Sequence, residues 1–144
     1  MIKFSKPSIT DLEKKYVLDA FDNSILSGDG KYTPMVYKQF LERFQIETML
    51  LTTSGTTALE MAALLIDLAP GDEVIVPSFT FSSTVNAFLL RGAVPVFCDI
   101  RFDTFNIDEN LIEELITEKT RAIYAVDYAG IPCEMEKIND IANK

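Results

Sequence analysis

Hydroxyl side chains gather around one glycine in the stretch TTSGTTALEMAALL, residues 52–65. Ser54, Thr56 and Thr57 flank Gly55, and apolar residues at helical spacing follow them. If a helix begins near Thr57, the backbone N–H groups of Gly55, Thr56 and Thr57 are unpaired donors at the positive end of its dipole. Phosphate binds such an end readily, Gly55 permits a close backbone approach, and the hydroxyls add hydrogen bonds. The spacing therefore predicts a candidate phosphate site.

A simpler interpretation of the same stretch is that a serine or threonine only caps the helix, since both are favoured N-caps. By spacing alone this alternative is the more common one. The segment from Leu59 to Leu68 is apolar almost all round, so we expect a helix buried on a sheet. The residues expected to face the strands are Leu59, Ala62, Ala63 and Ile66. Neither GxxxxGK[ST] nor GxGxxG is present here, which disfavours ATP hydrolysis and NAD binding.

A second candidate is VPSFTFSSTVNAF, residues 76–88, which leaves an expected strand through Pro77 and presents two aromatic rings before a helix. Phe81 could stack on a flat ligand ring. The alternative is that Phe79 and Phe81 pack under the loop, because aromatic residues serve cores more often than ligands. Composition leaves the two interpretations open.

The sequence has no histidine, which removes histidine-based triads, the usual zinc ligand sets and the commonest general base; no metal site is expected. Its two cysteines, Cys98 and Cys133, lie far apart without a CxxC pattern, so we interpret them as reduced thiols. A net charge of −9 argues against nucleic-acid and anionic-membrane partners. No apolar leader or span-length segment is found, so a cytoplasmic location is expected.

The elements that must position these residues alternate from Thr48 onward. Short β-prone runs are separated by helical segments of ten or more residues, which indicates an α/β fold: a mostly parallel sheet with helices packed on it. The expected strands are Met49–Thr52, Glu73–Val76, Val94–Cys98 and Ala122–Val126. In such a sheet, ligands gather at the carboxyl ends of the strands, and both candidate stretches follow a strand.

Signals at the ends of elements support the same layout. Pro70-Gly71-Asp72 predicts a turn, and Arg91-Gly92 predicts a helix end. Asp108 is expected to cap a helix, with Ile107 and Ile112 spaced as a hydrophobic staple. A last helix is expected over Glu134–Ala142. That helix would normally lead into another strand, so the sheet is expected to be incomplete within the 144 residues.

Residues 1–47 lie outside this alternation and are expected to hold two helices and a loop. Thr10-Asp-Leu-Glu13 is a capping box, so the first helix should begin near Thr10 and end around Asp22 to Ser24. The loop LSGDGKYTP, residues 26–34, leads into a second helix with Pro34 in its first turn.

Taken in order, the segments of this chain resemble the DegT/StrS type of pyridoxal-phosphate-dependent sugar-nucleotide aminotransferases. The segments that carry the resemblance are LSGDG at 26–30, LLTTSGTTALEMAALL at 50–65, GDEVIVPSFTFSSTVNAFLLRGAVPVFCDI at 71–100, DTFNID at 103–108 and YAGIPCEM at 128–135. The resemblance implies the N-terminal part of a fold-type-I aminotransferase large domain, spanning residues 1–144 with 48–144 as its alternating part. It also implies a homodimer or higher oligomer.

The resemblance assigns roles to residues of both candidate stretches. The turn of Ser54, Gly55, Thr56 and Thr57 would hold the phosphate of pyridoxal 5′-phosphate, and Phe81, in preference to Phe79, would stack on its pyridine ring. A third segment is similar to a family loop near the sugar nucleotide. Its candidate substrate-binding residues are Gly28, Asp29, Gly30 and Tyr32, although a plain glycine turn is the alternative.

The family's chemistry needs a lysine that forms a Schiff base with the cofactor and a carboxylate on the pyridine nitrogen. By resemblance, neither stands among these residues: both normally follow a strand that would come after Lys144, and Asp127 occupies a position where the family commonly has histidine. The role of Asp127 is left open between a structural contact and relaxed selection on catalysis. The sequence therefore predicts no catalytic residue here and an inactive chain on its own, whether as a piece, a truncated reading frame or a remnant.

Two functions remain. By resemblance, the first is a sugar-nucleotide aminotransferase that moves an amino group from glutamate to a dTDP-linked 4-keto-6-deoxy sugar for lipopolysaccharide or other cell-envelope polysaccharide. The second is a non-catalytic module that binds phosphate or a sugar nucleotide, or that only dimerises through an exposed apolar edge.

Overall fold

The computed structural model describes residues 5–144, which form two compact units, the first ending at Leu51 and the second spanning Thr52–Lys144. The first unit contains helices α1 (Asp11–Asp22) and α2 (Tyr32–Phe44). The expected capping box is confirmed: Thr10 Oγ1 accepts from Leu12 N–H at 3.2 Å, and Glu13 Oε2 accepts from Thr10 N–H at 2.7 Å. Neither helix buries a residue within this unit.

The second unit is built on a three-stranded parallel sheet in the order β2-β1-β3, which confirms the expected α/β class. Its strands are β1 (Glu73–Pro77), β2 (Val94–Cys98) and β3 (Thr120–Ile123), and its α-helices are α3 (Gly55–Leu65), α4 (Ser82–Leu89) and α5 (Met135–Ala142). Short 3-10 helices, η1 (Glu113–Leu115) and η2 (Tyr128–Gly130), lie in the connections on either side of β3.

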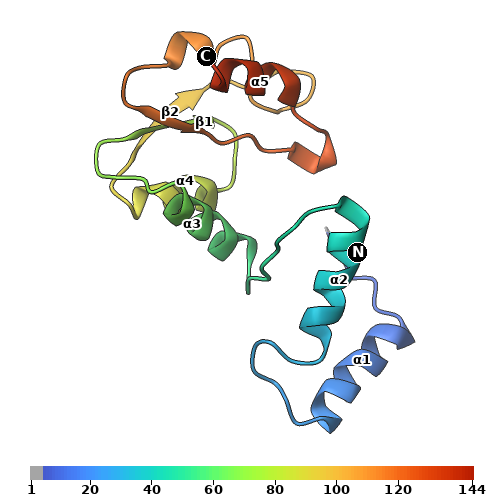
Figure 1. Ribbon diagram of the computed structural model, residues 1–144. Coiled ribbons are helices and arrows are strands. Elements are labelled where there is room, and N and C mark those ends of the chain that lie inside the picture. Colours follow the sequence, from blue (N-terminus) through green and yellow to red (C-terminus); the bar gives the residue numbers. More distant parts are fainter. Residues whose placement is uncertain (1–4) are drawn as a thin grey trace. The chain divides into compact units, whose positions relative to one another are not determined.

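The central strand divides two layers of core. Val74 and Val76 pack with Ala63 and Phe88 on the face that α3 and α4 cover, whereas Ile75 packs on the other face with the α5 cluster. Figure 1 shows α3 and α4 together on one side of the sheet and α5 on the opposite side. A strand buried on both faces is an uninterrupted apolar run, which is typical of parallel sheets.

Glycine at the predicted turns has the conformation that the turns require. Gly92 follows α4 with φ of +78°, and its N–H donates to Leu89 O at 2.9 Å. Gly71 has φ of +91° in the turn closed by Asp72 N–H and Ala69 O. The turn predicted at Pro70-Gly71-Asp72 and the helix end predicted at Arg91-Gly92 are therefore confirmed.

Two expected strand positions are wrong. Met49–Thr52 forms no strand: Leu51 N–H donates to the Tyr37 hydroxyl at 3.4 Å, and both flanks of β1 are already taken by β2 and β3. The last strand is Thr120–Ile123, earlier than the expected Ala122–Val126. Pairing stops soon after Ile75 and Ile123 because the neighbouring strand ends at Pro77, which has no N–H to donate.

No α-helix forms between β2 and β3, although one was expected after Asp108. Asp108 Oδ1 instead accepts from Asn110 N–H at 3.0 Å and closes a turn, and only η1 follows. Ile107 and Ile112 are nevertheless both buried in the α5-side cluster. The spacing identified two core residues correctly and assigned them to the wrong local structure.

Helix α3 is less buried than its composition suggested. Ala63 is its one buried residue, Leu59 is half-buried, and Ala62 and Ile66 are exposed. Ala63 packs in the cluster beneath α4, whereas Leu64, Leu65 and Ile66 are exposed. Burial against the sheet was expected for Leu59, Ala62, Ala63 and Ile66; it is confirmed for Ala63 and wrong for Ala62 and Ile66.

Candidate functional site

The candidate phosphate turn is the N-terminus of α3. Ser54 is the N-cap, and its Oγ accepts from Thr57 N–H at 3.1 Å while lying 3.0 Å from Thr57 Oγ1. Thr52 Oγ1 donates to Ser54 O at 2.9 Å. Local hydrogen bonds therefore hold this turn without a ligand, as the capping interpretation predicts.

Two backbone donors remain free at this helix end. The hydrogen bonds among the described residues give no acceptor to the N–H groups of Gly55 and Thr56, and the hydroxyl of Thr56 also has no partner there. Three unpaired N–H groups were expected at this helix end, but only two are found, because Thr57 N–H donates to the Ser54 cap. The helix starts at Gly55, and the turn follows no strand, so the donors depend on the helix end alone.

Space is available where an anion would approach. A Cβ added to Gly55 would meet no atom within 4 Å, and the backbone there is not in the left-handed region. Neither chain packing nor backbone strain therefore requires glycine at this position. Two convergent N–H donors, a free hydroxyl and the positive end of an 11-residue helix suit a phosphate group.

The aromatic turn after β1 presents its two rings differently. Phe79 packs edge-on against Tyr128 with ring centroids 5.2 Å apart and against Phe105 at 5.8 Å. Phe81 is the N-cap of α4, is 76% exposed and belongs to none of the ring pairs in the described residues. Phe79 therefore has the packing role, which leaves the Phe81 ring free to stack on a ligand.

A buried asparagine that the sequence analysis did not single out ties this region together. Asn106 is 2% exposed; its Nδ2 donates to Ile131 O and its Oδ1 accepts from Tyr128 N–H, both at 2.9 Å. Four of the six residues in DTFNID are polar, so nothing in the sequence distinguishes Asn106 from its neighbours. Its burial is informative, because a buried polar side chain is nearly always held by hydrogen bonds.

Asp127 has a structural contact in the same loop. Its Oδ1 accepts from Cys133 N–H at 2.9 Å, and Cys133 Sγ donates to Val126 O at 3.3 Å. Both cysteines are free thiols, as expected, and both are buried; burial raises the pKa of the Cys98 and Cys133 thiols to about 11. The Asp127 carboxylate closes the turn that follows β3.

The candidate substrate loop lies in the first unit, at residues 28–32. Asp29 has φ of +61°, and Tyr32 begins α2. Tyr32 Oη donates to Asp19 Oδ2 at 2.6 Å, and Lys31 Nζ lies 2.7 Å from the same oxygen. Lys31 and Tyr32 hold the pKa of Asp19 below its usual range, while the bond to Asp19 raises the pKa of Tyr32 to about 12. Gly30, Lys31 and Tyr32 line a hollow of about 260 Å³.

The described lysines that make contacts do so with surface groups. Lys31 pairs with Asp19, Lys144 with Glu113 and Lys14 with Asp11. Among residues 5–144, no group of three or more cysteine, aspartate or glutamate side chains is placed to hold a metal ion. None of the described helices is long and apolar enough to cross a bilayer.

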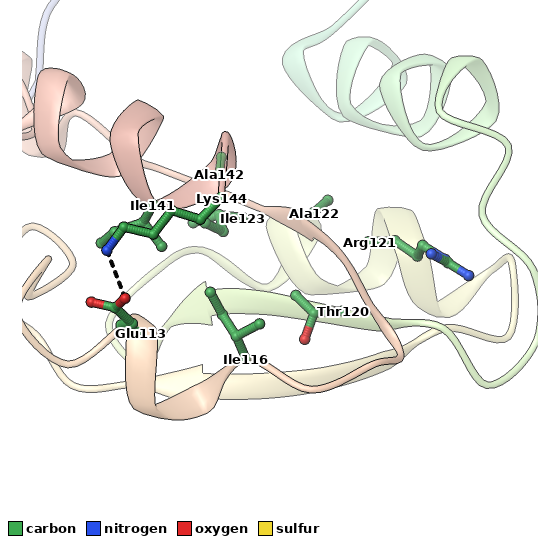
Figure 2. Close-up of a pocket in the computed structure, with 9 residues that line it drawn as sticks. All are labelled: Glu113, Ile116, Thr120, Arg121, Ala122, Ile123, Ile141, Ala142 and Lys144. Atoms are coloured by element: carbon green, nitrogen blue, oxygen red, sulfur yellow. Dashed lines mark hydrogen bonds and ion pairs between the residues drawn. The ribbon is translucent and has the colours of Figure 1, made fainter.

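A cavity of about 380 Å³ in the second unit is lined by none of the candidate residues. Figure 2 shows Ile116, Ile123 and Ile141 on its walls and the Lys144–Glu113 ion pair at one end, where Nζ and Oε1 are 2.7 Å apart. It opens beside β3, an edge strand of the described sheet. Its lining includes the cationic side chains of Arg121 and Lys144 but no aromatic ring and no α-helix N-terminus.

The family model that matches residues 7–144 is the DegT/DnrJ/EryC1/StrS aminotransferase family. The chain is 38% identical over 137 residues to GDP-perosamine synthase of Escherichia coli O157:H7, covering 95% of this chain and 38% of that protein. It is 32% identical over 144 residues to GDP-perosamine synthase of Vibrio cholerae, covering 100% of this chain and 39% of that protein. The chain thus spans well under half the length of these relatives.

Solved structures agree with this match. A Streptococcus pneumoniae protein assigned as a sugar aminotransferase, in its pyridoxal phosphate form, superposes with a TM-score of 0.87 and 36% identity, covering 97% of this chain and 36% of that one. Escherichia coli GDP-4-keto-6-deoxy-D-mannose-3-dehydratase with bound hydrated pyridoxal phosphate has a TM-score of 0.86 and 32% identity, covering 96% and 37%. The fold is therefore that of part of a fold-type-I enzyme of pyridoxal phosphate.

Proposed function

Because the chain belongs to the DegT/DnrJ/EryC1/StrS aminotransferase family, we propose that its second unit supplies the phosphate and ring contacts of a pyridoxal 5′-phosphate site in a sugar-nucleotide aminotransferase. The observation that carries this proposal is the pair of unpartnered N–H groups at Gly55 and Thr56 beside an open approach. Gly55, Thr56 and the Ser54–Thr57 cap hold the phosphate, and Phe81 stacks on the pyridine ring.

Each group has a separate task in this proposal. The two N–H donors and the positive end of the helix dipole bind the dianionic phosphate. The Ser54 cap keeps the donors aligned, so little ordering is needed on binding. The exposed face of Phe81 covers the ring and excludes water from it. The bound cofactor supplies the electron sink that amino transfer requires.

The substrate proposed is a nucleoside-diphosphate 4-keto-6-deoxy sugar, with glutamate as amino donor. The resemblance favoured a dTDP sugar, whereas relatives and neighbours are named for GDP-linked sugars. Gly28, Asp29, Gly30 and Tyr32 are the candidate contacts to this substrate. The aminotransfer itself is assigned to the homo-oligomeric whole enzyme, acting in cytoplasmic synthesis of cell-envelope polysaccharide, and residues 1–144 are proposed to contribute binding groups.

A titration with pyridoxamine 5′-phosphate tests the cofactor site. This probe has the ring and the phosphate but no aldehyde that would react with surface lysines. Thr56→Val removes one hydroxyl at nearly constant shape, and Thr56→Ser keeps the hydroxyl. We expect Thr56→Val to weaken binding about tenfold, the size of one hydrogen bond to a charged group, and Thr56→Ser to bind like the unaltered chain.

Calorimetry gives both affinities directly, with inorganic phosphate as a competitor. Equal affinity of the two Thr56 variants would remove the hydroxyl from the site. A chain that binds neither pyridoxamine phosphate nor inorganic phosphate would contradict the proposed function as a whole.

A further inference from the structure

The loop that follows β3 is held in an uncommon conformation. Within η2, Ala129 has φ of +52° and Gly130 has φ of +81°. A non-glycine residue in the left-handed region persists only where surrounding contacts determine its backbone. Hydrogen bonds within the loop hold part of it: Gly130 N–H donates to Asp127 O at 3.2 Å and Ile131 N–H donates to Tyr128 O at 3.0 Å. Further contacts come from another segment.

Asn106 makes those contacts at both ends of the loop. Its amide donates to Ile131 O and accepts from Tyr128 N–H, each at 2.9 Å. Asn106 is itself fixed, since its main-chain carbonyl oxygen accepts from the main-chain N–H of Arg101 at 2.8 Å and the residue is 2% exposed. One buried side chain thus contacts both ends of the loop, in addition to the hydrogen bonds that the loop makes within itself.

The loop in turn places a ring against the candidate cofactor turn. Tyr128 packs on Phe79 with centroids 5.2 Å apart, and Phe105, next to Asn106, packs on both at 5.8 and 5.9 Å. Phe79 lies two residues before Phe81 in the turn that joins β1 to α4. That turn is anchored at Ser78 N–H, which donates to Cys98 O at 2.8 Å, and at Thr80, whose hydroxyl donates to Thr84 at 2.9 Å.

We propose that Asn106 is a positioning residue for the cofactor ring: by holding residues 128–131 it keeps Tyr128 against Phe79 and thereby fixes the turn that presents Phe81. This inference rests on the proposed function, since it concerns the ring contact of that site. Asn106 touches neither ring nor phosphate in this arrangement. Its effect passes through Tyr128 and Phe79.

Two variants of Tyr128 test the path without disturbing the core, because this side chain is 42% exposed. Tyr128→Phe keeps the ring, and Tyr128→Leu removes it. We expect Asn106→Ala and Tyr128→Leu to weaken pyridoxamine 5′-phosphate binding about three- to tenfold, the range for loss of aromatic packing. Tyr128→Phe should leave that affinity unchanged, and all three should bind inorganic phosphate normally.

A pH profile separates positioning from a general loss of stability. In Asn106→Asp the new carboxyl is buried, which raises its pKa. Once protonated, it can donate to Ile131 O and accept from Tyr128 N–H as the amide does. The affinity ratio between this variant and the unaltered chain should therefore approach one as the pH falls. Ile138→Ala, in α5, controls for destabilisation and should show no such pH dependence.

Hydrogen exchange of residues 78–81 completes the test, since it needs no ligand. We expect faster exchange there in Asn106→Ala and Tyr128→Leu than in Ile138→Ala. If pyridoxamine phosphate binds the unaltered chain and these variants change neither affinity nor exchange, the positioning role is wrong and the cofactor site stands. If the unaltered chain does not bind the probe, the proposed function fails and the role fails with it.

Discussion

At Gly55 the chain leaves open a space that its own packing does not need. A methyl group there would meet nothing within 4 Å, and the backbone conformation is accessible to any residue. Alanine would also favour the helix over glycine by up to about 1 kcal/mol. The proposed phosphate site gives glycine a role here, because a ligand can approach its backbone closely.

Gly55→Ala is accordingly expected to separate binding from stability. Binding of pyridoxamine 5′-phosphate should fall by about tenfold or more, because the methyl group would stand between the phosphate and the Gly55 and Thr56 donors. The thermal midpoint should be unchanged or slightly higher. Calorimetry and a melting curve on the same sample measure both quantities, and unchanged affinity would mean that phosphate does not approach here.

The two thiols provide a residue-scale prediction that is independent of any ligand. Burial is the main cause that raises the pKa of Cys98 and Cys133 to about 11, from a reference value of 9.0. The nucleophile is the thiolate, so alkylation at pH ~8 should be about a hundredfold slower in the folded chain than after unfolding. Mass spectrometry of iodoacetamide-treated samples counts the adducts; rapid labelling of the folded chain would contradict this burial.

The same shift has a consequence for stability. The folded state binds the thiol protons more tightly than the unfolded state. The raised thiol pKa therefore adds to the free energy of unfolding, and this addition is complete below the unfolded pKa. It is lost as the pH rises through about 9 to 11.

At the level of elements, the sequence predicted best where the signal was local. The capping box of α1, the glycine turns, β1, β2 and α5 all lie close to their expected positions, because each depends on neighbouring residues. Pairing partners are not local. Leu50 and Leu51 have strand composition but no strand beside them, and Asp108 caps a turn because its side chain bonds to Asn110.

The site shows the same division. A serine or threonine cap was predictable from residue types, and the choice of Phe81 over Phe79 came from the family resemblance. The use of Thr57 N–H by the Ser54 cap depends on the folded turn and was not predicted. The Asn106 contact with Tyr128 spans 22 residues and has no sequence periodicity that could reveal it. Long-range polar contacts of this kind depend on the folded arrangement.

Helix α1 gives the element-scale prediction. Thr10→Ala removes the hydroxyl that accepts from Leu12 N–H and should cost about 1 kcal/mol of helix stability. Amide exchange in α1 should then accelerate about fivefold by the same free energy. Ser8→Ala, at an exposed position before the cap, is the matched control. Equal exchange in both variants would show that the capping box does not stabilise this helix.

For the whole molecule, the two units divide the proposed work. The second unit, residues 52–144, contains the phosphate turn, the ring at Phe81 and the Asn106 contact, on both sides of one three-stranded sheet. The first unit contains the candidate substrate loop and two helices that bury nothing within it. Cofactor binding is therefore proposed as a property of the second unit, and it can be measured without turnover.

Backbone amide chemical shifts during a titration with pyridoxamine 5′-phosphate measure cofactor binding by the second unit most directly. The account predicts that the largest changes fall on Gly55 and Thr56, followed by residues around Phe81, and that inorganic phosphate reproduces only the first group. Changes centred instead on the cavity beside β3, at Arg121 and Lys144, would contradict the assignment of the cofactor phosphate to the N-terminus of α3.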